Sequence, residues 1–149
     1  MGVIIMNKFH KSHYTGIIGE SMVITKLLSM RLEAFKPLLD INGCDLIVRL
    51  KSGKYLRLQI KTSILHKYHN KYNRAYFIWN RKMDQYDFDL FIGVILDKDN
   101  KIICYYIIPR FNVLPNVNSL CVNPFNINRD RFEQYKNNWA ILSGTSMVD

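Results

Sequence analysis

The sequence predicts an α+β fold with an α/β-like core, in which helices flank a mixed central β-sheet within a single domain of residues 1–149. Two observations support this prediction. An apolar stripe with helical spacing comes early in the chain, and a second helical pattern comes late. Between them lie several segments in which apolar and polar residues alternate, as they do in half-buried strands.

The first predicted element is a helix over residues 15–31. Its apolar positions recur three and four residues apart; they are Ile17, Val23, Ile24, Leu27 and Leu28. Glu20 falls inside this stripe, and a buried carboxylate requires a cation partner or a proton. Residues 34–39 form an extended piece, which Pro37 limits to a sheet edge or a strand end.

A β-hairpin follows, with strands over residues 44–50 and 54–61. The apolar sides of both strands must face the same core, and directly opposed residues of a hairpin point to the same face. A three-residue loop, Lys51-Ser52-Gly53, satisfies this condition, because Gly53 accepts the left-handed conformation that such loops require. This register pairs Leu50 with Lys54 and Asp45 with Gln59.

The register places Asp45, Gln59 and Lys61 on one face of the hairpin. A divalent ion such as Mg²⁺ or Mn²⁺ prefers oxygen ligands, which Asp45, the Gln59 side chain and the Ile60 carbonyl can supply. Glu20 can bind the same ion directly or through water. Such an ion would lower the pKa of a bound water, and Lys61 would orient that water, deprotonate it or offset developing negative charge. Glu20, Asp45, Gln59 and Lys61 are therefore the candidate catalytic residues.

The rest of the chain is predicted from turn signals and alternation. It comprises a loop over 62–74, a strand over 75–79, a second hairpin of strands 90–96 and 101–108, an irregular stretch over 111–128 and a helix over 129–137.

The chain carries 21 basic and 12 acidic residues, a net charge of +9. Such an excess favours a polyanionic partner, most commonly nucleic acid, although it also fits a protein kept soluble by its charge. The candidate DNA contacts are Arg49, Arg57, His66, Lys67, Tyr68, His69, Lys71, Tyr72 and Arg74. The alternative for the 66–74 stretch is a solvated loop. The histidine pairs at 10/13 and 66/69 could suggest zinc, but they lack the Cys or carboxylate support usual for it.

Three cysteines without a CxxC spacing argue against a disulfide framework. The N-terminus has no basic residues before its short apolar stretch, and no run approaches transmembrane length. We therefore expect an intracellular, cytoplasmic protein, associated with the nucleoid if the cell is prokaryotic.

Three segments resemble the PD-(D/E)XK nuclease superfamily: Gly16-Ile17-Ile18-Gly19-Glu20, Gly43-Cys44-Asp45-Leu46-Ile47-Val48 and Leu58-Gln59-Ile60-Lys61-Thr62-Ser63. The resemblance implies that Asp45 is the central metal ligand, Lys61 the catalytic lysine and Glu20 the helix-borne acid. The sequence departs from the motif at Cys44, where Pro is usual, and at Gln59, where an acid is usual. In this respect the sequence resembles a branch of the superfamily, the homing endonucleases carried by group I introns, in which a Gln also occurs at this position. Residues 86–94 and 105–109 are similar to the later strands of that branch.

We therefore expect a metal-dependent, site-specific endonuclease for double-stranded DNA, of the intron-encoded homing type. The alternatives are a Holliday junction resolvase or a restriction-type nuclease of the same superfamily, and a non-catalytic DNA-binding module, which Gln59 favours. A double-strand break needs two hydrolyses, so we expect a homodimer or a higher homo-oligomer. Its interface could come from the second hairpin or from residues 139–142, although both could equally be core.

Overall fold

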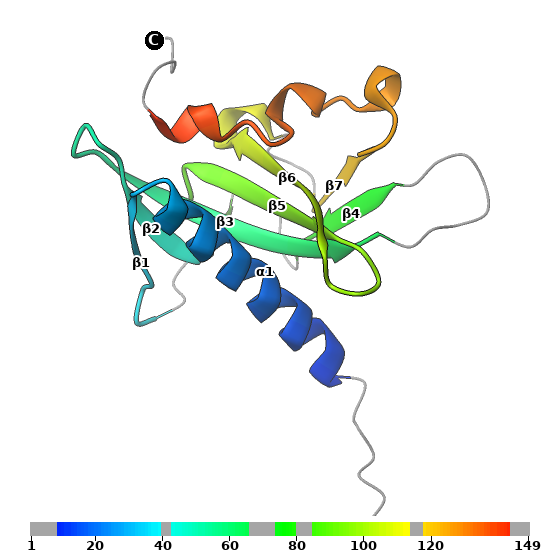
Figure 1. The fold of residues 1–149 in the computed structure, drawn as a ribbon, viewed down its shortest axis with the longest axis horizontal. Coiled ribbons are helices and arrows are strands. Elements are labelled where there is room, and N and C mark those ends of the chain that lie inside the picture. The colour runs from blue at the N-terminus through cyan, green and yellow to red at the C-terminus, as the bar shows by residue number, and fades with distance from the viewer. Residues whose placement is uncertain (1–8, 40–42, 66–73, 80–84, 114–117, 144–149) are drawn as a thin grey trace, which may run out of the picture.

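The computed structural model describes residues 9–39, 43–65, 74–79, 85–113 and 118–143 (Figure 1). A long helix, α1 (Phe9–Ser29), precedes a mixed five-stranded sheet in the order β1-β2-β3-β5-β6 and a two-stranded ribbon of β4 and β7. The strands are β1 (Glu33–Phe35), β2 (Leu46–Arg49), β3 (Tyr55–Ile64), β4 (Ala75–Ile78), β5 (Leu90–Leu96), β6 (Ile102–Pro109) and β7 (Ser119–Val122). No helix among the described residues is both long and apolar enough to cross a membrane.

The main sheet is mixed because β3 and β5 run parallel, whereas its other neighbouring strands are antiparallel. Its two faces have separate cores. On one face, Val23 and Leu27 of α1 pack against the apolar side of the hairpin and of β5. On the other face, the inward side of the β4–β7 ribbon, including Phe77, packs against Phe91 and Ile95 of β5. The predicted α+β class and mixed sheet are confirmed, with one face covered by α1 and the other by the ribbon.

The predicted hairpin register is confirmed. Leu46 pairs with Leu58, Val48 pairs with Leu56, and the Leu50 N–H donates to the Lys54 carbonyl at 2.8 Å. Gly53 closes the loop with φ of +85°, in the left-handed region. The paired register ends at Leu46–Leu58, one residue after Asp45, and the Asp45 N–H makes a last backbone hydrogen bond to the Leu58 carbonyl at 2.8 Å.

Several predicted boundaries shift. The helix begins at Phe9, before the predicted start at residue 15, and ends at Ser29. Arg31 has φ of 57°, so the chain turns before the predicted end at residue 31. The extended piece is shorter than predicted, because only Glu33–Phe35 pairs with β2. In contrast, β3 continues to Ile64, because residues 62–64 pair with β5 rather than beginning a loop.

The predicted helix over residues 129–137 is wrong. The structure has two single 3₁₀ turns there, η3 (Ile127–Arg129) and η4 (Glu133–Tyr135). The buried Asp130 accepts hydrogen bonds from the Tyr106 hydroxyl and from the Phe132 N–H, which holds the backbone away from helical geometry. Asn137 exchanges two hydrogen bonds with the backbone of Tyr105 in β6. Tertiary bonds to β6 therefore override the local helical pattern.

The irregular stretch predicted over residues 111–128 contains β7, a strand that the pattern did not indicate. Only Leu120 and Val122 of its four residues are buried, which is too little alternation to stand out in the sequence. Two further 3₁₀ segments, η2 (Arg110–Asn112) and η5 (Trp139–Ser143), complete the described chain.

Candidate active site

The Asp45 carboxylate occupies the end of the β2–β3 hairpin, immediately before β2. Its Oδ2 accepts hydrogen bonds from Gln59 Nε2 at 2.7 Å and from the Ile60 N–H at 2.6 Å. The structure thus brings together Asp45, Gln59 and Ile60, which the register placed side by side. These two donors fix the carboxylate at the point where the pairing of β2 with β3 stops. The carboxylate thus takes the place of the backbone carbonyl that would otherwise accept from the Ile60 N–H.

The amide of Gln59 is only 3% exposed, and its Oε1 is a buried atom without a hydrogen-bond partner among the described residues. An unpaired buried acceptor is energetically costly, and a divalent cation is one group that could satisfy it. The amide presents Nε2, not Oε1, to Asp45. Binding of one ion by both side chains would therefore require the Gln59 amide to turn over.

Gly43 and Tyr86 are two site residues to which the sequence analysis gave no role. Gly43 has φ of +74°, and a Cβ at this position would overlap both the Tyr86 ring and Gln59 Oε1. The ring and the amide therefore both pack directly against the glycine backbone. A glycine two residues before the acid was the available signal, but the sequence did not show which side chains fill the space beside it.

Lys61 follows Gln59 by two residues on β3 and is half-buried. Side chains two residues apart on a strand share a face, so Lys61 lies on the side of the sheet that carries Gln59. The same face carries the β4–β7 ribbon, because Lys61 pairs with Gly93 and Gln59 with Phe91 in the β3–β5 register.

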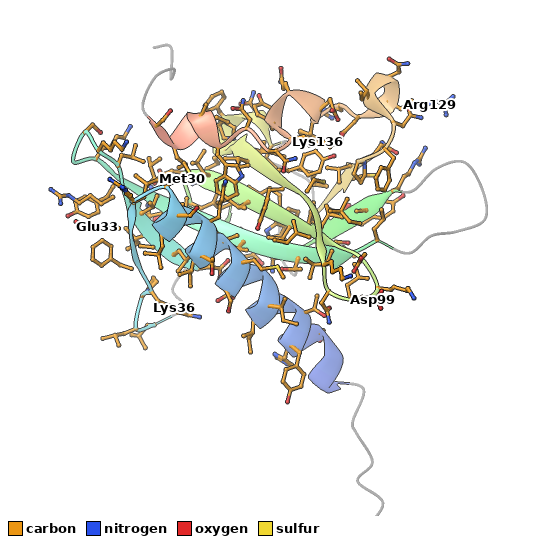
Figure 2. All side chains as sticks on the ribbon, viewed as in Figure 1. Met30, Glu33, Lys36, Asp99, Arg129 and Lys136 are labelled. Atoms are coloured by element: carbon orange, nitrogen blue, oxygen red, sulfur yellow. The ribbon has the colours of Figure 1, made fainter. Side chains whose placement is uncertain are left out.

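Glu20 comes from α1, which covers the opposite face of the sheet. Its Oε2 accepts a hydrogen bond from Lys36 Nζ at 2.8 Å, and its side chain is 25% exposed. Figure 2 shows Lys36 on the segment after β1, on the side of the molecule where α1 lies. The cation partner that the sequence analysis required for Glu20 is therefore Lys36 in this structure, and the role of Glu20 as a metal ligand stays a prediction.

Arg57, a candidate DNA contact, is engaged by two carboxylates. Its guanidinium donates to Asp89, with Nη2 3.0 Å from Oδ1, and also to Asp87. Burial acts to raise the pKa of Asp89, but the hydrogen bonds from the Arg57 side chain and backbone outweigh it and lower that pKa below its usual value. Arg57 thus ties the centre of the hairpin to the segment before β5.

Two other candidate DNA contacts, Arg49 and Arg74, lie among the described residues, and both are exposed. Arg49 forms an exposed ion pair with Glu33 at 3.3 Å, and such pairs contribute little to stability. Arg74 is exposed immediately before β4. The remaining candidates, His66, Lys67, Tyr68, His69, Lys71 and Tyr72, lie outside the described residues.

The donor set of this site fits a hard divalent cation. Asp45 offers a carboxylate, Gln59 offers the unpaired Oε1, and Ile60 offers a backbone carbonyl. Within the described ranges, no three His, Cys, Asp or Glu side chains form a group that could hold a metal ion. The proposed set contains only two such side chains, Asp45 and Glu20, and depends on neutral oxygens for the rest. The three cysteines are free thiols.

Comparison with known proteins places this geometry in a known fold. No protein-family model matches the chain, and no curated protein matches it in sequence. Among solved structures, a bacterial homing endonuclease, I-Ssp6803I, matches 89% of this chain and 91% of its own, with a TM-score of 0.68 and 21% identity. The chain therefore shares the fold of this structure. At this identity the likeness shows the fold alone.

Proposed function

We propose that the protein is a metal-dependent, site-specific endonuclease for double-stranded DNA, a PD-(D/E)XK enzyme of the intron-encoded homing type acting inside the cell. The observation that carries the proposal is the Asp45 carboxylate held by Gln59 and Ile60, with Lys61 on the same face of the sheet. The fold shared with a bacterial homing endonuclease and the net charge of +9 support it.

In this proposal, Asp45, Gln59 and the Ile60 carbonyl would hold Mg²⁺ or Mn²⁺. Glu20, which is bonded to Lys36 in this structure, would have to leave Lys36 to join them. When bound, the ion supplies a water of lowered pKa and a positive charge beside the scissile phosphate. Lys61 holds the attacking water in line with the phosphorus or accepts its proton, and as an ammonium it offsets charge on the phosphoryl oxygens. Burial of Gln59 excludes bulk water from one side of Asp45, which strengthens the electrostatic interactions there.

Cleavage should depend on a divalent cation. We expect the protein to cut a pool of long linear duplexes in Mg²⁺ or Mn²⁺, to stop in excess chelator and to resume when Mg²⁺ is restored, as read on a denaturing gel. Cutting that persists in chelator would contradict the metal site, and binding without cutting in either metal would favour the non-catalytic DNA-binding module. Preferential cutting of four-way junctions over linear duplexes would instead identify a junction resolvase.

The proposed enzyme acts as a homodimer or a higher homo-oligomer. One chain carries one candidate site, whereas a double-strand break requires hydrolysis of two antiparallel strands, most simply by sites related by a two-fold axis. Sedimentation of the free and DNA-bound protein should show at least a dimer on a roughly palindromic target. A monomer in both states that still makes double-strand breaks would refute this.

Most of the two stretches considered for the subunit interface packs into the chain's own core, whereas Ile102 and Ala140 are exposed. Every residue of β5 is buried, and Leu142 is buried beneath the end of the main sheet. The ring of Trp139 packs edge-on against Tyr105, with centroids 5.0 Å apart. The structure thus favours the alternative reading of these stretches as internal packing.

A further inference from the structure

The β4–β7 ribbon has an outer face that the proposed chemistry does not use. Tyr76 and Ile78 of β4 point away from the core and are 51% and 67% exposed. In the antiparallel register, Tyr76 pairs with Cys121 and Ile78 pairs with Ser119, which is also exposed. We call these side chains the ribbon patch; they are Tyr76, Ile78, Ser119 and Cys121.

The ribbon patch lies on the same side of the main sheet as the candidate site. The ring of Phe77, on the inner face of β4, lies over Gly93, where a Cβ would overlap it. Gly93 is in turn the register partner of Lys61. Packed sheet layers are about 10 Å apart, so the ribbon stands roughly one layer above the strand that carries Lys61. Figure 1 shows the ribbon at the end of the main sheet farthest from β1.

The charge around the ribbon patch suits a polyanion. Residues 74–79 and 118–123 contain no acid, and Arg74 stands at the entry to β4. The sequence that leads into β4 is basic, with Lys67 and Lys71 before Arg74, in a chain of net charge +9. A duplex would therefore approach this end of the molecule without meeting a carboxylate on the ribbon.

The side chains of the ribbon patch can also discriminate between bases. The major groove is wide enough to admit a two-stranded β-ribbon and displays a distinct donor and acceptor pattern for each base pair. The hydroxyls of Tyr76 and Ser119 can both donate and accept hydrogen bonds, and Ile78 can contact the methyl group of thymine. Contacts to the phosphates alone would position the duplex without reading its sequence.

We propose that the outer face of the β4–β7 ribbon enters the major groove of duplex DNA and reads base pairs beside the cleavage site. This inference rests on the proposed function, because it assigns the sequence recognition that a site-specific endonuclease requires. Tyr76 and Ile78 are its principal specificity residues, with Ser119 opposite Ile78.

The test is selection of duplexes from a randomised pool in chelator, where no strand is cut. The wild-type protein should enrich a defined sequence. The double variant Tyr76→Ala/Ile78→Ala should still bind the pool but lose the preference at a few adjacent base pairs. The affinity ratio between selected and scrambled duplexes should then fall roughly 10- to 100-fold. Tyr76→Phe, which removes only the hydroxyl and should leave the fold intact, should relax the preference at one position.

A matched control is available on α1. Tyr14 and Ile17 are the same residue types, 59% and 60% exposed, and α1 covers the opposite face of the sheet. The double variant Tyr14→Ala/Ile17→Ala should select the wild-type sequence. Circular dichroism melts should show that each variant folds.

If both ribbon variants select the same sequence as the wild type, the ribbon inference is overturned. If these variants also keep Mg²⁺-dependent cutting, the nuclease proposal stands. An unchanged sequence together with a shift in sedimentation would also overturn it, because the ribbon patch would then be a subunit interface. A wild-type protein that cuts DNA in Mg²⁺ but enriches no sequence would overturn the ribbon inference and the site-specific part of the proposed function. A protein that neither cuts nor binds duplexes would overturn both.

Discussion

Replacing Asp45 by alanine is expected to reduce DNA cleavage by roughly 10²- to 10³-fold or more, while DNA binding stays largely intact. Two hydrogen bonds from β3, at 2.6 and 2.7 Å, hold the Asp45 carboxylate in place. Binding depends mainly on phosphate contacts spread over the basic surface, which this substitution does not touch. Single-turnover cleavage and a mobility-shift titration, carried out on the same duplex, would separate the two effects.

Two controls make this experiment selective. Asp45→Asn keeps an acceptor for the Ile60 N–H but removes the charge, so it should lose cleavage without the destabilisation expected when two buried donors lose their partner. Asp99→Ala removes an exposed acid in the β5–β6 turn and should cut normally. Lys61→Ala should resemble Asp45→Ala, whereas the exposed Lys101→Ala should not. Full activity of Asp45→Ala would end the assignment of this site.

The second large effect is expected at Gln59. Gln59→Leu fills the same buried space but has no oxygen to offer a cation and no donor for Asp45, so cleavage should fail. Gln59→Glu keeps an oxygen and should be tolerated or should shift the preference between Mg²⁺ and Mn²⁺. Near-normal cutting by Gln59→Leu would show that Gln59 has only a structural role.

Gln59→Glu also allows a measurement that does not depend on cleavage. It places two carboxylates within hydrogen-bonding distance in a buried site, and their repulsion raises the pKa of one of them. Without metal, the variant should therefore be less stable than the wild type at neutral pH and should regain stability as the pH falls and one carboxyl becomes protonated. Mg²⁺ should raise its melting temperature more than that of the wild type. Equal metal responses would argue against an ion at this position.

The hairpin was predictable because its information is local. Two alternating strands, a three-residue loop and a glycine at the left-handed position allow only one register, and that register is the one observed. The prediction that Asp45 and Gln59 meet followed directly from it. No long-range knowledge was needed, since these residues are only 14 positions apart in the chain.

The features that the sequence did not indicate depend on distant contacts. The helical pattern over 129–137 gave way because Asp130 bonds to Tyr106, which is 24 residues away. The stripe around Glu20 did not reveal Lys36, and nothing local showed that Tyr86 packs on Gly43. The strand predicted over 75–79 is present as β4, but its partner β7 was missed, because the two strands lie more than 40 residues apart in the chain.

The parallel pairing of β3 with β5 has a consequence for how the chain folds. The 25 residues between Ile64 and Leu90 must form a closed loop before these strands can pair, whereas the β2–β3 hairpin closes across three residues. Contacts between distant segments slow folding more than local ones do. The hairpin that carries Asp45 and Gln59 can therefore nucleate early, and the ribbon, which needs β7 as well, is expected to dock last. The order of assembly would place the proposed hydrolytic residues first and the proposed base-reading surface at the end of the folding pathway.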